Sequence, residues 1–255
     1  MSSQTFLDVP TPACNEKEGK TSSESWSYTS VSPSPSASSK DISLAGASGK
    51  TLTFKHASLH TDTLVQDVGG NAVYFADASA FTPGKADVTL HSGGDNKGPV
   101  LAVAKWSSMY SAKAVVGLGD PGAAGDNMDV AWEEMHAASG WKQNEHRWSI
   151  PVAVSGAGSG RKAFTWKRTH RVGCEKNRAS SRNFKLVEEE SGEVVAVYAT
   201  ASVKSWNTLG TLTFSGEREL GERVERMALM TVLALIEKSR RRNRAIRANG
   251  GAVAG

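Results

Sequence analysis

The stretch that most constrains the fold is MALMTVLALI, residues 227–236, which carries no charge and is followed closely by a run of arginines. A membrane-spanning helix needs about 20 apolar residues, so these ten residues are too few to cross a bilayer. As a helix, the stretch would present large apolar side chains in every direction, and such a helix is surrounded by protein or by lipid. Because lipid is excluded by length, we expect the stretch to lie inside a protein core.

The residues around this stretch predict a helix over about residues 217–241. Ser215 is a suitable N-cap, and the charged residues on either side suit the two poles of a helix dipole. The acidic residues near the start are Glu217, Glu219 and Glu222, and the basic residues near the end are Lys238, Arg240 and Arg241. We expect residues 243–255 to form a flexible tail.

The middle of the chain predicts strands. From Lys50 to Phe214, twelve short segments alternate apolar and polar residues, and they are separated by Gly, Pro, Asp or Asn. Turn sequences such as SGGDNKG (92–98) and ESGE (190–193) indicate hairpins, and therefore an antiparallel meander. An eight-stranded barrel is already about as wide as its own side chains can fill. We therefore predict a mainly β fold in which a closed antiparallel barrel of about twelve strands surrounds the C-terminal helix.

The start of the chain has a different composition. Residues 1–48 are rich in Ser and Pro and poor in large apolar residues, so we expect a disordered tail ahead of a folded domain over residues 49–242. The first residues have neither a basic start nor an apolar run, so no signal peptide is expected. Cys14 and Cys174 lack CxxC spacing, which excludes a cysteine-rich zinc site and favours a reducing compartment. We expect a cytoplasmic protein, with the membrane periphery and the nucleus as alternatives.

The strand count, the apolar terminal helix and the run YFADASAFTPGKADVTLHSG (74–93) resemble the tubby C-terminal-like superfamily, which includes LURP-one-related proteins and phospholipid scramblases. More narrowly, the chain looks like a fungal branch of that group. The resemblance implies a barrel with a buried helix, peripheral to membranes, that binds phosphoinositide headgroups in the tubby case. The scramblase branch would require calcium and a cluster of palmitoylated cysteines, whereas Cys14 is the single cysteine of the leading tail. No binding residue is carried over from the family.

The segment 161–185 is the strongest candidate for a binding site, because it holds nine Lys and Arg against one Glu. On a strand, Phe164 and Trp166 point one way and Lys167 the other, which gives an outward basic face. Such a face attracts phosphate groups on lipid or nucleic acid, unless it is a solvated surface without a partner. The residues that we expect to bind an anionic ligand are Arg161, Lys162, Lys167, Arg168, Arg171, Lys176, Arg178 and Arg182.

The arginines of segment 240–247 offer a second candidate contact with an anionic membrane leaflet. A short basic run is also typical of a nuclear address. The alternative without a partner is a helix C-terminus with its favourable charges, followed by a solubilising tail.

The glycine-rich segment SGAGSGRK (155–162) does not match a phosphate-binding loop, because Gly160 is followed by Arg161 and no helix comes next. We expect a hairpin loop between two strands. Its backbone amides, beside Arg161 and Lys162, would make at most a weak anion nest.

We expect no metal, no cofactor and no catalytic centre. His56 and His60 on a strand would lie about 13 Å apart and could not share a metal. Asp120, Asp126 and Asp129 do not follow the spacing of a calcium loop. The order of the residues supports neither a Ser-His-Asp nor a Cys-His arrangement.

The tryptophans are expected mainly in the core. Trp132, Trp148 and Trp166 fall in predicted strands and should pack inward. An exposed tryptophan would instead suit a lipid interface.

These observations predict a non-enzymatic, tubby-like domain that binds reversibly to anionic membrane lipid, of the phosphoinositide type, through a basic barrel face. One alternative is a structural or protein-interaction module whose Ser/Pro-rich tail is regulated by phosphorylation. Nucleic-acid binding through the same basic face is the less favoured alternative.

Overall fold

A computed structural model describes residues 49–57, 61–79, 84–108, 111–123, 130–138, 145–154, 158–169, 183–201, 205–216 and 220–250. The chain divides into two compact units, residues 1–40 and 41–255, and all described residues belong to the second. The disordered tail predicted for residues 1–48 therefore lies outside the described residues.

The described residues of the second unit form twelve strands in a closed antiparallel barrel, in which each strand pairs with its neighbours in the sequence and β1 pairs with β12. The strands are β1 (Thr51–His56), β2 (Thr63–Gln66), β3 (Ala72–Ala78), β4 (Val88–Ser92), β5 (Val100–Trp106), β6 (Lys113–Leu118), β7 (Ala131–Ala137), β8 (Glu145–Val154), β9 (Gly158–Arg168), β10 (Phe184–Glu188), β11 (Val194–Thr200) and β12 (Thr208–Phe214). Tight turns use glycines in the left-handed region, such as Gly93 at φ 87° and Gly192 at φ 71°. The predicted meander and its strand count are confirmed.

The hairpin predicted at 155–162 is confirmed as the connection between β8 and β9, but its second strand begins within the predicted loop. Strand β9 begins at Gly158, and both Gly158 and Gly160 are paired in the ladder with β8. Their backbone groups are engaged in the sheet, so the weak anion nest predicted beside Arg161 does not form there.

The helix α1 (Glu222–Gly250) starts later and ends later than predicted. Gly221 has φ 80°, and its carbonyl accepts the first helical hydrogen bonds, so Gly221 takes the capping position predicted for Ser215. The Ser215 amide instead donates to the Val195 carbonyl, which extends the sheet past β12. Beyond residue 241, arginine and alanine favour the helix, and α1 therefore occupies much of the segment predicted as a flexible tail.

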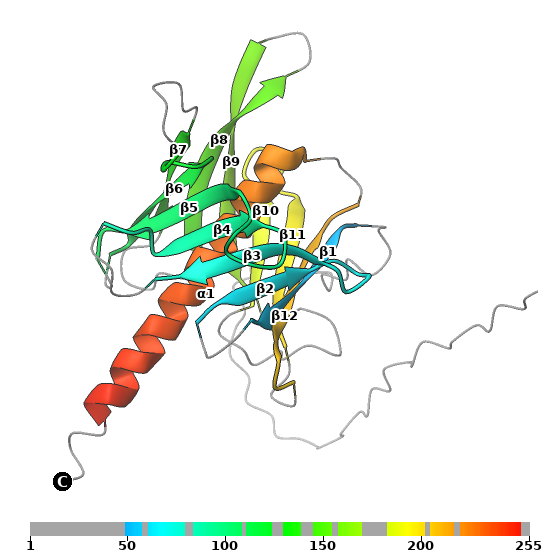
Figure 1. The fold of residues 1–255 in the computed structure, drawn as a ribbon. Coiled ribbons are helices and arrows are strands. Elements are labelled where there is room, and N and C mark those ends of the chain that lie inside the picture. The colour runs from blue at the N-terminus through cyan, green and yellow to red at the C-terminus, as the bar shows by residue number, and fades with distance from the viewer. Residues whose placement is uncertain are drawn as a thin grey trace, which may run out of the picture. The chain divides into compact units, whose positions relative to one another are not determined.

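The apolar stretch of α1 fills the barrel. Every residue from Met227 to Ile236 is buried, and these side chains join the inward side chains of the strands in one core that includes Trp148, Trp166 and Phe164. Figure 1 shows α1 running between the strands and extending past them with its C-terminal part. The helix plug is thus confirmed. No helix in the described part of the chain is both long enough and apolar enough to cross a membrane.

The two ends of the barrel can be told apart by the helix. At the end where α1 leaves, which we call the exit end, Lys238 donates to the Ser111 carbonyl at 2.7 Å and Arg240 to the Thr61 carbonyl at 2.8 Å. The connections that follow β1, β3, β5, β7, β9 and β11 lie at this end. The opposite end, where α1 begins, is the entry end.

Candidate functional site

The structure splits the predicted basic face between the two ends. Arg161 and Lys162 lie near the entry end, where β9 begins, and both are held in ion pairs. Arg161 pairs with Glu133 and also donates to the Ser149 hydroxyl at 3.0 Å, while Lys162 pairs with Glu188 at 2.6 Å. Glu133 and Glu188 are both buried, so Arg161 and Lys162 neutralise buried carboxylates of the barrel.

Lys167 and Arg168 lie at the exit end, where β9 finishes. Lys167 faces outward, between Glu145 of β8 and Lys185 of β10 in the strand register, and Arg168 is exposed. Lys185 was not among the predicted ligand-binding residues, and only the register brings it opposite Lys167. Within the described part of the chain, no ion pair is formed by Lys167, Lys185 or Arg168. Phe164 and Trp166 point into the core, as predicted.

The other predicted residues of this face follow β9 and precede β10. They lie outside the described residues, and they are Arg171, Lys176, Arg178 and Arg182. Since β9 ends and β10 begins at the exit end, the segment that carries them starts and finishes at that end.

Four arginines in the C-terminal half of α1 fall into two groups. Arg241 is bound to Asp87 at 2.6 Å and to Glu237 at 3.0 Å, and Arg244 is bound to Glu237 at 2.7 Å. Arg242 and Arg247 are exposed on the protruding part of the helix and have no ion pair among the described residues. The first group fastens the helix to the barrel rim, and the second is free to meet an anionic partner.

Lys238 occupies an intermediate position. Its ammonium lies 4.1 Å from the centroid of the Trp106 ring and donates to the Ser111 carbonyl. Burial, together with the nearby charge of Arg242, lowers the pKa of Lys238 to about 8. The Lys238 ammonium is therefore held by groups of the barrel, and we do not count it among the cations available to a partner.

The free cations of the exit end, which we call the basic rim, are those without an ion pair among the described residues. They are Lys55, Lys105, Lys167, Arg168, Lys185, Arg242 and Arg247. Two carboxylates of this end, Asp62 and Glu145, also lack an ion pair there. The rim is therefore strongly positive.

Trp206 lies at the same end, on the connection between β11 and β12, and it is 95% exposed. A tryptophan side chain that is this exposed is available to a partner surface. No periodic signal in the sequence marked this residue, because it falls between strands. Of the tryptophans expected in the core, Trp148 and Trp166 are buried, whereas Trp132 is 51% exposed because it faces outward over Gly117.

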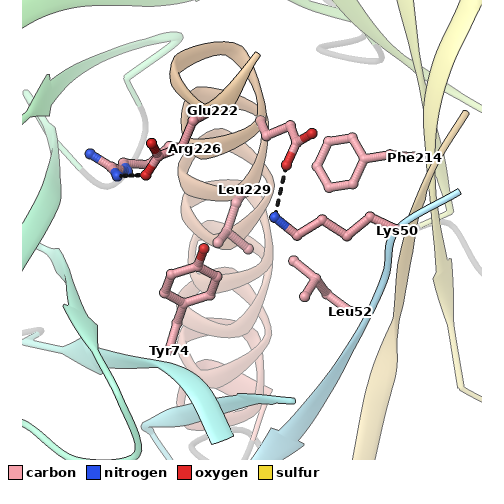
Figure 2. A pocket seen from close by; sticks show the side chains of 8 residues that line it. Lys50, Leu52, Tyr74, Phe214, Glu222, Arg226 and Leu229 are labelled. Carbon is pink, nitrogen blue, oxygen red and sulfur yellow. Dashed lines mark hydrogen bonds and ion pairs between the residues drawn. The ribbon is translucent and has the colours of Figure 1, made fainter. Parts of the chain in front are cut away.

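A small cavity at the entry end is the remaining candidate near the helix. Figure 2 shows Lys50 reaching from the start of β1 to a helix carboxylate, that of Glu225, at 2.8 Å, while Arg226 pairs with Glu222. Burial alone would lower the pKa of Lys50, but the hydrogen bond and charge of Glu225 outweigh it and raise the pKa. The cavity measures about 10 Å³, which is room for about one water molecule. We interpret this cluster as a latch between α1 and the barrel.

No family model matches the chain, and no curated protein is similar to it. Among solved structures, a protein from Arabidopsis thaliana is similar, with 13% sequence identity and a TM-score of 0.42. The match covers 77% of this chain and 97% of that one. A likeness at this level is too weak to support a conclusion about fold or function.

Proposed function

We propose that the barrel binds reversibly to anionic membrane lipid through its exit end, and that its role is binding and not catalysis. The observation that carries this proposal is the gathering of the basic rim and the exposed Trp206 at one end of the molecule. The resemblance of the sequence to tubby-like domains favours a headgroup of the phosphoinositide type.

The register explains why this surface is suited to phosphate. Lys167 and Lys185 are directly opposite each other on adjacent strands, and like charges in that position destabilise a sheet. A phosphate that bridges the two ammonium groups removes this repulsion. Glu145, on the other side of Lys167, offsets part of the charge but lies on one flank only.

The expected strength follows from the number of free cations. Each Lys or Arg near an anionic leaflet contributes about 1 kcal/mol, and this contribution declines within a Debye length and with added salt. The rim therefore supports an affinity of a few kcal/mol, to which an inserted indole adds. Binding of this size is reversible, which suits a peripheral domain.

The test is co-sedimentation with three kinds of vesicle. The first is phosphatidylcholine alone, the second is phosphatidylcholine with phosphatidylserine, and the third is phosphatidylcholine with a polyphosphorylated phosphoinositide. We expect binding to the last two kinds of vesicle at low salt, stronger binding to the phosphoinositide, and a steep loss with added salt. The key variant is Lys167→Glu/Lys185→Glu, which should reduce vesicle binding by more than about tenfold.

The entry end offers a matched control. Lys97 and Arg223 are exposed there and have no ion pair among the described residues. Lys97→Glu/Arg223→Glu changes the net charge by the same amount but should leave vesicle binding nearly intact. Equal losses in the two double variants would show that net charge alone acts and would overturn docking through the exit end.

Two other outcomes would replace this proposal. Binding to RNA or DNA with a steep salt dependence, without preference among vesicles, would assign the rim to nucleic acid. Capture of a protein partner that survives high salt, without vesicle binding, would favour an interaction module.

A further inference from the structure

The outer wall of the barrel is not uniform. On β7 the outward side chains Glu134 and His136 are exposed, as expected for a surface that faces water. On β4 and β5 the outward side chains Thr89, His91 and Val103 are only 9%, 8% and 5% exposed. These residues form the floor of a groove of about 480 Å³, which is within the size range of small-molecule sites.

The walls of the groove come from neighbouring turns. Asp77 is opposite Thr89, and Thr89 is opposite Val103, so one row of the register runs across the floor. The pair of Asp77 and Lys85 lines one side, and the turn that follows β6, with Asp120 and Pro121, lines another. Asn96, on the connection between β4 and β5, also lines the groove, which is therefore built from three strands and three connections.

Two polar groups of the floor have hydrogen-bonding capacity left over. The His91 Nδ1 atom lies 2.9 Å from the Gly98 carbonyl, and because a carbonyl can only accept, Nδ1 carries the proton. In a neutral ring the Nε2 atom is then an acceptor, and it has no partner within the described part of the chain. The Thr89 hydroxyl also makes no hydrogen bond there. Neither atom is fully buried, and both residues line the groove, so a ligand or water in the groove can bond to them.

The charge of the groove selects the kind of ligand. Lys85 is neutralised by Asp77 at 2.6 Å. The Asp120 carboxylate accepts one hydrogen bond, from the Gly122 amide at 2.8 Å, and has no cation beside it among the described residues. The groove is thus lined by the unpaired carboxylate of Asp120, the imidazole of His91 and the apolar side chains of Val100 and Val103. An anionic ligand would meet repulsion here, whereas a cation would be attracted.

We propose that this groove binds a small primary amine with an apolar body, with the ammonium directed to Asp120 and His91 and the apolar part over Val100 and Val103. No residue of the basic rim lines the groove, and its ligand has the opposite charge, so this proposal does not depend on membrane binding.

The experiment is an NMR titration of the full chain with three probes of similar size, phenethylamine, phenethyl alcohol and hydrocinnamate. We expect saturable shifts for the amine at the amides of Thr89, His91 and Gly122, weaker shifts for the alcohol and none for the acid. Equal responses to amine and acid, or shifts spread over the whole surface, would overturn the proposal.

Variants test the residues. Asp120→Asn keeps an acceptor for the Gly122 amide and should still fold, and it should weaken amine binding about fivefold, the scale of a partly exposed ion pair. Val103→Trp fills the groove and should abolish binding. Glu190→Gln removes one exposed carboxylate from the turn between β10 and β11 and should change nothing. An equal effect of Glu190→Gln and Asp120→Asn would show general charge attraction and would contradict a defined site.

Discussion

The two ends of the barrel carry charges of both signs, but they use them differently. At the entry end, the carboxylates without an ion pair among the described residues are Asp67, Asp95, Asp120 and Glu190, against the cations Lys97 and Arg223. At the exit end the imbalance is reversed, because the acidic residues are mostly consumed by ion pairs and the basic rim is left over. A formal charge of +4 conceals this polarity. The lesson is that the pairing of charges, more than their number, decides which end can meet an anionic surface.

The two ends also hold α1 by different means. At the exit end the buried carboxylate of Glu237 receives Arg241 and Arg244, and Arg240 lies 3.8 Å from it. At the entry end the Lys50 and Glu225 side chains form one latch, in which Lys50 is 47% exposed. A buried network is strongly destabilised when one member is removed, whereas an exposed pair contributes little.

The largest effect should come from a charged substitution in the buried part of α1, which runs between the two ends of the barrel. Leu233→Asp places a carboxylate in an apolar core where Leu233 is 3% exposed, at a cost of several kcal/mol that exceeds the reserve of many domains. We expect loss of the cooperative thermal transition in circular dichroism. Ile246→Asp makes the same change on the protruding part of α1, where Ile246 is 59% exposed, and should fold normally. A folded Leu233→Asp protein would contradict the enclosed position of the helix.

The next largest effect compares the two fastenings of α1. Glu237→Gln leaves the arginines around it without their shared carboxylate and should lower the free energy of unfolding by about 3 kcal/mol. Glu225→Gln at the entry end should lower it by less than about 1 kcal/mol. Urea denaturation measures both variants. If the two variants lose similar amounts of unfolding free energy, the contacts at the exit end do not hold α1 more strongly than those at the entry end.

Much of the fold could be predicted because it depends on local periodicity. Alternation along each segment indicated the strands, and an apolar stretch without a polar face indicated a helix that is enclosed. The start of α1 was missed because it depends on one backbone angle, that of Gly221, and not on the acidic residues before it. Its end was missed because a charged helix can continue into solvent when its residues favour helix.

The candidate site was less predictable because pairing is a long-range property. Arg161 and Lys162 belong to the same basic segment as Lys167, but their partners Glu133 and Glu188 are 28 and 26 positions away in the sequence. Arg241 meets Asp87 across 154 positions. Strand register alone determines which of these cations remain free, and a single sequence does not specify it.

A smaller effect is expected from the exposed tryptophan. Trp206→Ala removes an indole that packs against nothing in the described chain, so the thermal midpoint should not change. Its affinity for anionic vesicles should drop about tenfold, because an indole partly inserted at the interface contributes about 1–2 kcal/mol. Trp206→Phe should retain most of the affinity. Unchanged vesicle binding by Trp206→Ala would confine the contact to the charges of the rim.

A pH-dependent effect separates Lys238 from the basic rim of the same end. Its pKa is about 8 in the folded protein against an ordinary 10.5, so the unfolded chain holds the proton more tightly between these two values. The charged form therefore destabilises the fold below about pH 8, and this penalty fades as the pH rises towards the unfolded pKa. Lys238→Met keeps an apolar chain over Trp106 without the charge. In urea denaturation, the unmodified protein should gain stability relative to Lys238→Met as the pH rises from about 8 to 10.5. Parallel pH profiles would show that the Trp106 ring and the Ser111 carbonyl fully compensate the burial of the Lys238 ammonium, and would contradict a lowered pKa of Lys238.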